Sequence, residues 1–81
     1  MERKLESEIQ AAIIRQYEQH GYLVVKIGLC NKKGFPDLMA LKDGKALFIE
    51  VKRPGEKPRP LQEYRHRELR EKGFEVLILT E

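Results

Sequence analysis

Three ionisable side chains near the middle of the chain have types and spacing suited to phosphodiester chemistry. Asp37 follows a proline, and Glu50 and Lys52 are separated by one residue. Two carboxylates held close together repel each other, which raises a pKa or requires a cation. Mg²⁺ relieves such repulsion, binding through one or two carboxylates together with phosphate oxygens and water. With a lysine beside the carboxylates, the set predicts metal-assisted hydrolysis of a phosphodiester.

A tight turn is expected to bring these side chains together. Asp43-Gly44 lies between two short apolar runs and is the strongest hairpin signal in the chain. If these two residues form the turn, Asp37 and Glu50 lie directly opposite each other, with Cβ atoms roughly 4.5–5.5 Å apart. Lys52 then projects to the same face of the sheet as Glu50. The alternative is that Asp37 only begins a strand and that Glu50 and Lys52 form an ordinary surface pair.

The surrounding elements are predicted in the order αβββαβ. The first three strands form an antiparallel meander, and the third and fourth are parallel because a helix connects them in a right-handed crossover. The second and third strands are apolar on both faces, so each face requires a helix. The predicted elements are a helix over 5–20, strands over 22–27, 37–41 and 46–51, a helix over 60–72 and a strand over 74–79.

Length and composition limit the class of protein. The 81 residues and 9.5 kDa predict a single domain over 1–81 with a marginal core. One cysteine, Cys30, excludes a disulfide framework and a cysteine-based zinc site. Since no apolar run is long enough for a membrane span and no leader pattern is visible, we expect a cytoplasmic protein of a bacterial or phage-infected cell.

The positive charge is concentrated in one segment. Residues 52–72 contain eight Lys or Arg and four Glu, whereas the rest of the chain has a net charge of −1. Clustered cations suit contacts with nucleic-acid phosphates, although a solvated helix with compensating glutamates has the same composition.

Two segments resemble a known nuclease family. Gly34-Phe35-Pro36-Asp37, followed by Glu50-Val51-Lys52, resembles the PD-(D/E)xK nuclease superfamily, and residues 50–62 (EVKRPGEKPRPLQ) resemble the virus-type replication-repair nuclease (VRR-NUC) domain. The resemblance extends over essentially the whole chain. It implies a restriction-endonuclease-like fold with a mixed four-stranded sheet, and Mg²⁺- or Mn²⁺-dependent cleavage of DNA in replication and repair. Small stand-alone phage and bacterial members imply a homodimer that acts on branched DNA such as Holliday junctions.

The resemblance also implies residue roles. Asp37 and Glu50 would be metal ligands together with the carbonyl of Val51, and Lys52 would be the catalytic lysine. The family carries a Glu or Gln on the first helix that points into the site. Here Glu6, Glu8 and Gln10 are available, and proximity to the apolar stripe favours Gln10 or Glu6 over Glu8. The residues expected to contact DNA are Lys32, Lys33, Arg53, Lys57, Arg59, Gln62, Arg65 and His66. Gln62 matches a glutamine that opens the second helix in the family, so a contact with the site is an alternative for it.

Other readings remain open from the sequence. The chain could be a non-catalytic nucleic-acid-binding accessory module, or a protein–protein interaction domain whose charges only confer solubility. His66 is expected to contact phosphate or solvent, and His20 is expected to be exposed at a helix end. Tyr64 and Leu69 form a narrow apolar stripe on the second helix, so part of the sheet is expected to need a second subunit.

Overall fold

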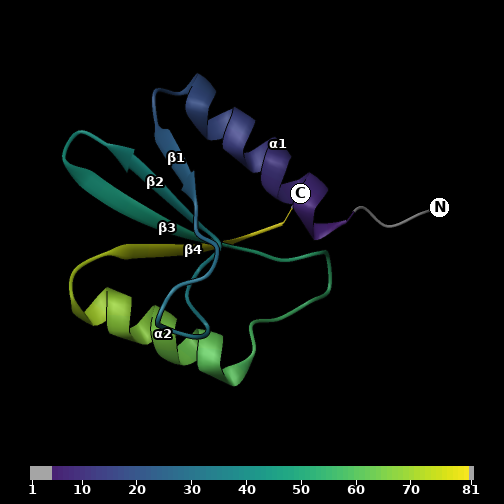
Figure 1. The fold of residues 1–81 in the computed structure, drawn as a ribbon, viewed down its shortest axis with the longest axis vertical. Coiled ribbons are helices and arrows are strands. Elements are labelled where there is room, and N and C mark those ends of the chain that lie inside the picture. Colours follow the sequence, from purple (N-terminus) through teal and green to yellow (C-terminus); the bar gives the residue numbers. More distant parts are fainter. Residues whose placement is uncertain (1–4, 81) are drawn as a thin grey trace.

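The secondary structure follows the predicted order. The structure is a computed structural model that describes residues 5–80. Its elements are α1 (Glu6–Gln19), β1 (Leu23–Lys26), β2 (Leu38–Lys42), β3 (Lys45–Val51), α2 (Pro60–Glu71) and β4 (Glu75–Leu79) (Figure 1). Each boundary lies within one residue of the prediction, and the αβββαβ fold is confirmed.

The four strands form one mixed sheet in the order β1-β2-β3-β4. The β1–β2 and β2–β3 pairs are antiparallel, whereas β3 and β4 are parallel and are connected through α2. Lys42 pairs with Lys45, so the two-residue turn at Asp43-Gly44 is confirmed. Both turn residues have positive φ, 53° and 73°, as this kind of tight hairpin requires.

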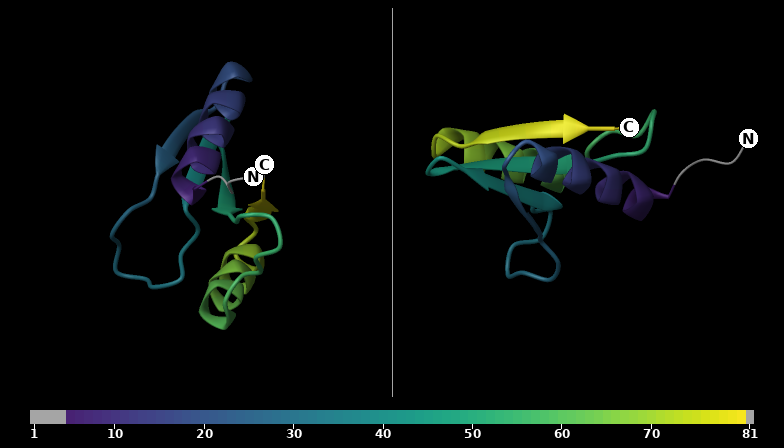
Figure 2. Two further views of the ribbon diagram at one scale, coloured as in Figure 1. Left: turned by 90° about the vertical axis from the view of Figure 1, so that its right-hand side faces the viewer. Right: turned by 90° about the horizontal axis from the view of Figure 1, so that it is seen from above.

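The helices cover opposite faces of the sheet (Figures 1 and 2). Alternation along the strands divides the core in two, because successive side chains point to opposite faces. The core under α1 contains Ile9, Ile13, Leu38, Ala40, Ile49 and Val51. The core under α2 contains Phe48, Leu69 and Val76. Within residues 5–80, no helix has the length and apolar character needed to cross a bilayer.

The loop between β1 and β2 is attached to α2. The Arg65 side chain donates from Nε to the Lys33 carbonyl oxygen at 2.8 Å. Gly34 has φ +79° and lies so close to Leu61 that a Cβ on it would be 2.9 Å from the Leu61 Cγ. At the end of the loop, the Ile27 N–H donates to the Asp37 carbonyl at 2.8 Å. These contacts fix the backbone that carries Asp37.

Candidate active site

The predicted trio is brought together where β2 begins and β3 ends. Leu38 and Ile49 are the last backbone pair of the hairpin, and just beyond them the Val51 N–H donates to the side-chain Oδ2 of Asp37 at 2.8 Å. Asp37 and Glu50 therefore face each other on the side of the sheet that α2 covers. Glu50 is 1% exposed and Lys52 is 8% exposed, so neither is an ordinary surface residue.

Burial and the neighbouring carboxylate strongly perturb Glu50. Removal from water, followed by the hydrogen bond and the charge of Asp37, raises the pKa of Glu50 to about 8. The Lys52 ammonium opposes this shift, and the carboxylate of Glu6 adds to it. When Glu50 is ionised, the carboxylates of the site outnumber its lysine, and this condition favours binding of a cation in place of the proton.

Helix α2 contacts both oxygens of Glu50. His66 Nε2 lies 3.1 Å from Glu50 Oε1, and Gln62 donates from Nε2 to Glu50 Oε2 at 3.3 Å. His66 is 1% exposed, and its burial, followed by the charge of Arg70, lowers the pKa of the imidazole. The imidazole is therefore neutral at pH 7.

The expectation that His66 contacts phosphate or solvent is wrong, because α2 turns its side chain into the protein. A signal for this placement was present in the sequence. His66 is four residues after Gln62 and three before Leu69, and this spacing puts all three on one helix face. The apolar stripe predicted for this helix included Tyr64 instead. Tyr64 is 46% exposed and lies near the guanidinium groups of Arg65 and Arg67.

The first helix presents its three candidates differently. Glu8 is exposed and accepts a hydrogen bond from the Leu5 N–H at 2.9 Å, so its side chain caps the start of α1. Glu6 is half-buried and within electrostatic reach of Glu50. Gln10, one turn later, is half-buried, and its Oε1 is fully buried with no hydrogen-bond partner among the described residues. Gln10 and Glu6 both remain candidates for a role in the site.

Comparison with known proteins identifies the family. The chain is 36% identical over 75 residues to "Putative nuclease p44" of Acyrthosiphon pisum secondary endosymbiont phage 1, which covers 91% of this chain and 81% of the phage protein. A solved structure described as "VRR_NUC domain" is 32% identical, with a TM-score of 0.83 over 93% of this chain and 83% of that one. The chain belongs to the VRR-NUC family.

A second solved structure, "VRR_NUC domain protein", is 17% identical with a TM-score of 0.80 over 99% of this chain and 80% of that one, and it supports the fold alone. No protein-family model matches the chain.

The cations expected to contact DNA differ in availability in this VRR-NUC chain. Lys32, Lys33, Lys57 and Arg59 are exposed. Arg53 forms an ion pair with Glu56 at 3.3 Å. Arg65 lies 2.7 Å from Glu68 in addition to its contact with the loop, so its guanidinium already has a structural role.

The donor atoms of the site are compatible with Mg²⁺. Asp37, Glu50 and the Val51 carbonyl offer oxygen atoms, which are the ligands that hard divalent cations prefer. The described part of the chain contains no group of three or more His, Cys, Asp or Glu side chains that could hold a metal ion. A metal at this VRR-NUC site would therefore need backbone, amide or water oxygens in addition to the two carboxylates.

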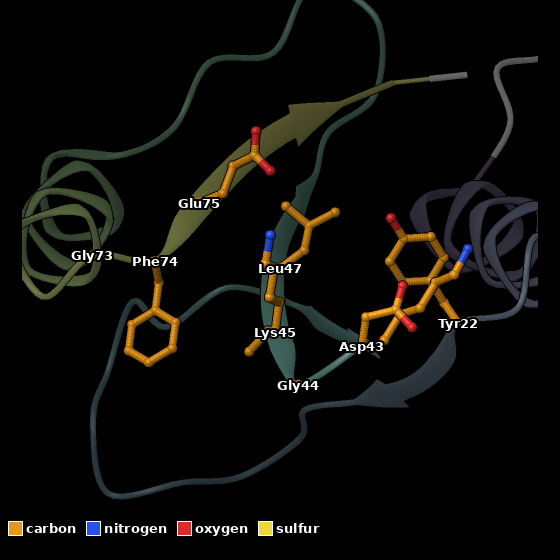
Figure 3. A pocket seen from close by; sticks show the side chains of 10 residues that line it. Tyr22, Asp43, Gly44, Lys45, Leu47, Gly73, Phe74 and Glu75 are labelled. Carbon is orange, nitrogen blue, oxygen red and sulfur yellow. The ribbon is translucent and has the colours of Figure 1, made fainter.

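A cavity of about 610 Å³ lies at the opposite end of the sheet, around the hairpin turn (Figure 3). Its lining includes Tyr22, Lys45, Leu47, Phe74 and Glu75 and none of the predicted trio. This cavity is therefore not the candidate active site, since Glu50, the carboxyl group whose pKa is raised, does not line it.

Proposed function

We propose that this VRR-NUC chain is a metal-dependent endonuclease that hydrolyses phosphodiester bonds in DNA, with branched DNA such as Holliday junctions as its substrate. The observation that carries the proposal is the convergence of Asp37, Glu50 and Lys52 at one end of the sheet, two of them almost fully buried. The adjoining basic segment and the similarity to a phage protein named as a nuclease support it.

In this proposal, Asp37, Glu50 and the Val51 carbonyl hold Mg²⁺ or Mn²⁺. The bound ion would supply an acidified water molecule and neutralise charge on the phosphate. Lys52 orients the attacking water or stabilises the charge that develops on the phosphate oxygens. Glu6 or Gln10 provides a further oxygen from α1. The attacking water gives up a proton as its oxygen bonds to phosphorus, the bond to the leaving oxygen breaks, and the leaving oxygen takes up a proton, so that the protons balance.

We further propose that the active form is a homodimer, because two sites related by a two-fold axis match a junction with two symmetric scissile strands. Exposed apolar side chains on both edge strands support this: Leu23 is 62% and Val25 38% exposed on β1, and Ile78 is 44% exposed on β4. Sedimentation velocity should give twice the chain mass. A monomer at every concentration tested would contradict the dimer without affecting the cleavage proposal.

Asp37→Asn tests the catalytic assignment. We expect it to lower cleavage by about 100-fold or more, because the change removes a negatively charged oxygen from the proposed metal site. Four-way, flap, splayed and linear DNA should be compared with Mg²⁺ or Mn²⁺. Asp43→Asn is the matched control, since its side chain lies in the exposed hairpin turn. Equal cleavage by wild type and Asp37→Asn would overturn the assignment.

A second candidate is a non-catalytic nucleic-acid-binding module, which the basic segment also supports. It predicts DNA binding that weakens steeply with salt and does not depend on a divalent metal. Binding and cleavage measured on the same substrates separate the two functions, because only the nuclease loses strand scission when EDTA is added.

A further inference from the structure

We infer that His66 is a positioning residue that, together with Gln62, holds the carboxylate of Glu50 in one orientation from a single face of α2. The inference rests on the proposed function, in which Glu50 is a metal ligand. The buried face of α2 thereby has a role that differs from the DNA contact expected of the cations on the same helix.

The first argument is that the two side chains contact different oxygens of the Glu50 carboxyl group. His66 Nε2 lies 3.1 Å from Oε1, and Gln62 Nε2 lies 3.3 Å from Oε2. A carboxylate held at only one oxygen can rotate about its terminal bond, whereas donors on both oxygens fix its plane. Each oxygen has two lone pairs, so one on each remains available for a cation.

The second argument concerns the orientation of the Gln62 amide. Its Oε1 accepts a hydrogen bond at 2.8 Å from the backbone N–H of Arg59, the residue that precedes α2. Since the amide oxygen is used there, the amide NH₂ group must face Glu50. The start of the helix thereby determines which end of Gln62 the carboxylate meets.

The third argument is the burial and anchoring of the contact. His66 and Glu50 are both 1% exposed, so water does not compete for their hydrogen bond. Three residues after His66, Leu69 packs into the core beneath α2 with Phe48 and Val76. The helix is therefore fixed relative to β3, the strand that carries Glu50.

Groups of this kind orient metal ligands, and removing one typically lowers metal affinity about 10–100-fold without abolishing binding. We expect His66→Phe, which keeps a ring but has no N–H donor, to weaken Mn²⁺ binding by about that factor. His66→Gln places an amide donor near the position of Nε2 and should restore most of the affinity. His20→Phe is the matched control, because His20 is exposed at the end of α1.

Mn²⁺ binding should be measured by electron paramagnetic resonance without DNA, with circular dichroism to establish that each variant is folded. The proposal is overturned if folded His66→Phe binds Mn²⁺ as tightly as the wild type, or if His66→Gln is no better than His66→Phe. Should His66→Phe fail to fold, the comparison of His66→Gln with His66→Asn replaces it, because the shorter amide does not reach Glu50.

A metal-free measurement separates this inference from the proposed function. Long-range ¹H–¹⁵N spectra of the imidazole at pH above 8.5 should show a proton on Nε2 of His66, and Glu50→Ala should shift that resonance. If the wild type binds no Mn²⁺, the proposed metal site fails, whereas these spectra still decide whether His66 holds Glu50. An Nε2 resonance that is unaffected by Glu50→Ala would overturn the inference.

Discussion

Glu50 is the residue whose environment differs most from that of an exposed carboxyl group. It is buried beside Asp37, and its neighbours include one cation, Lys52, and the uncharged side chains of His66 and Gln62. Hydrogen bonds from neutral groups do not remove the repulsion between the two carboxylates. The metal-free site therefore holds a proton that a bound divalent cation would displace.

This predicts how the stability of the metal-free protein depends on pH. Glu50 ionises near pH 4.5 in the unfolded chain and near pH 8 in the folded protein. Because the raised pKa belongs to the folded state, the contribution of Glu50 to the free energy of unfolding is fully present below pH 4.5 and is lost as pH rises through about 8. The fall is on the order of 2 kcal/mol or more.

Urea denaturation in EDTA at several pH values between 4.5 and 8 measures this effect. Glu50→Gln should remove the fall in the free energy of unfolding that comes from Glu50. Glu71→Gln, at the exposed end of α2, should show the same fall as the wild type. A wild type and a Glu50→Gln variant with the same pH dependence would contradict the raised pKa.

At the scale of elements, the hairpin and the β1–β2 loop position Asp37. The tight turn sets the register that places Asp37 opposite Glu50, and it requires positive φ at Gly44. The β1–β2 loop leads to Asp37 through Gly34, which has a positive φ and lies too close to Leu61 to carry a side chain. Replacing each glycine with alanine should therefore lower the free energy of unfolding by different amounts.

We expect Gly44→Ala to lower the free energy of unfolding by about 1–2 kcal/mol, because a Cβ there meets no atom within 4 Å and only the backbone conformation is unfavourable. Gly34→Ala should cost more, since its Cβ would also lie 2.9 Å from the Leu61 carbonyl oxygen. Gly28→Ala is the control, with an open position and no positive φ. Thermal or urea denaturation gives the ranking, and equal costs at positions 28 and 34 would contradict it.

The sequence was sufficient for the elements and for the hairpin register, because turn chemistry at Asp43-Gly44 and alternation along the strands act locally. It was insufficient for the surroundings of Glu50. Whether His66 points inwards depends on how α2 rotates against the sheet, and that rotation is set by Leu69 packing on Phe48, a contact between distant segments. Because α2 contains many charged residues, its inward face, formed by Gln62, His66 and Leu69, was hard to recognise from the sequence.

At the scale of the whole molecule, the two ends of the sheet differ in character. One end carries Asp37 and the buried Glu50 and adjoins the basic segment, and the other carries the hairpin turn and the cavity of Figure 3. If DNA binds at the first end, cations there should contribute to the salt dependence of binding and those at the turn should not.

We expect the double change Lys57→Ala and Arg59→Ala to reduce the slope of log affinity against log salt concentration by about two, since each phosphate contact contributes nearly one. Both side chains are exposed beside the start of α2. Lys45→Ala, next to the hairpin turn, should leave the slope unchanged. Fluorescence anisotropy with a labelled junction in EDTA provides the measurement, and equal slopes for both variants would contradict a DNA surface at the active-site end.

The attachments of α2 also restrict how the chain can diverge. Leu61 and Arg65 hold the loop that leads to Asp37, while Gln62 and His66 hold Glu50. These two pairs interleave within about one and a half turns. One inserted residue between positions 62 and 65 would rotate the later member of each pair by about 100° relative to the earlier one. Substitutions between these positions are therefore tolerable, whereas insertions and deletions would put both carboxylates out of phase with their supports.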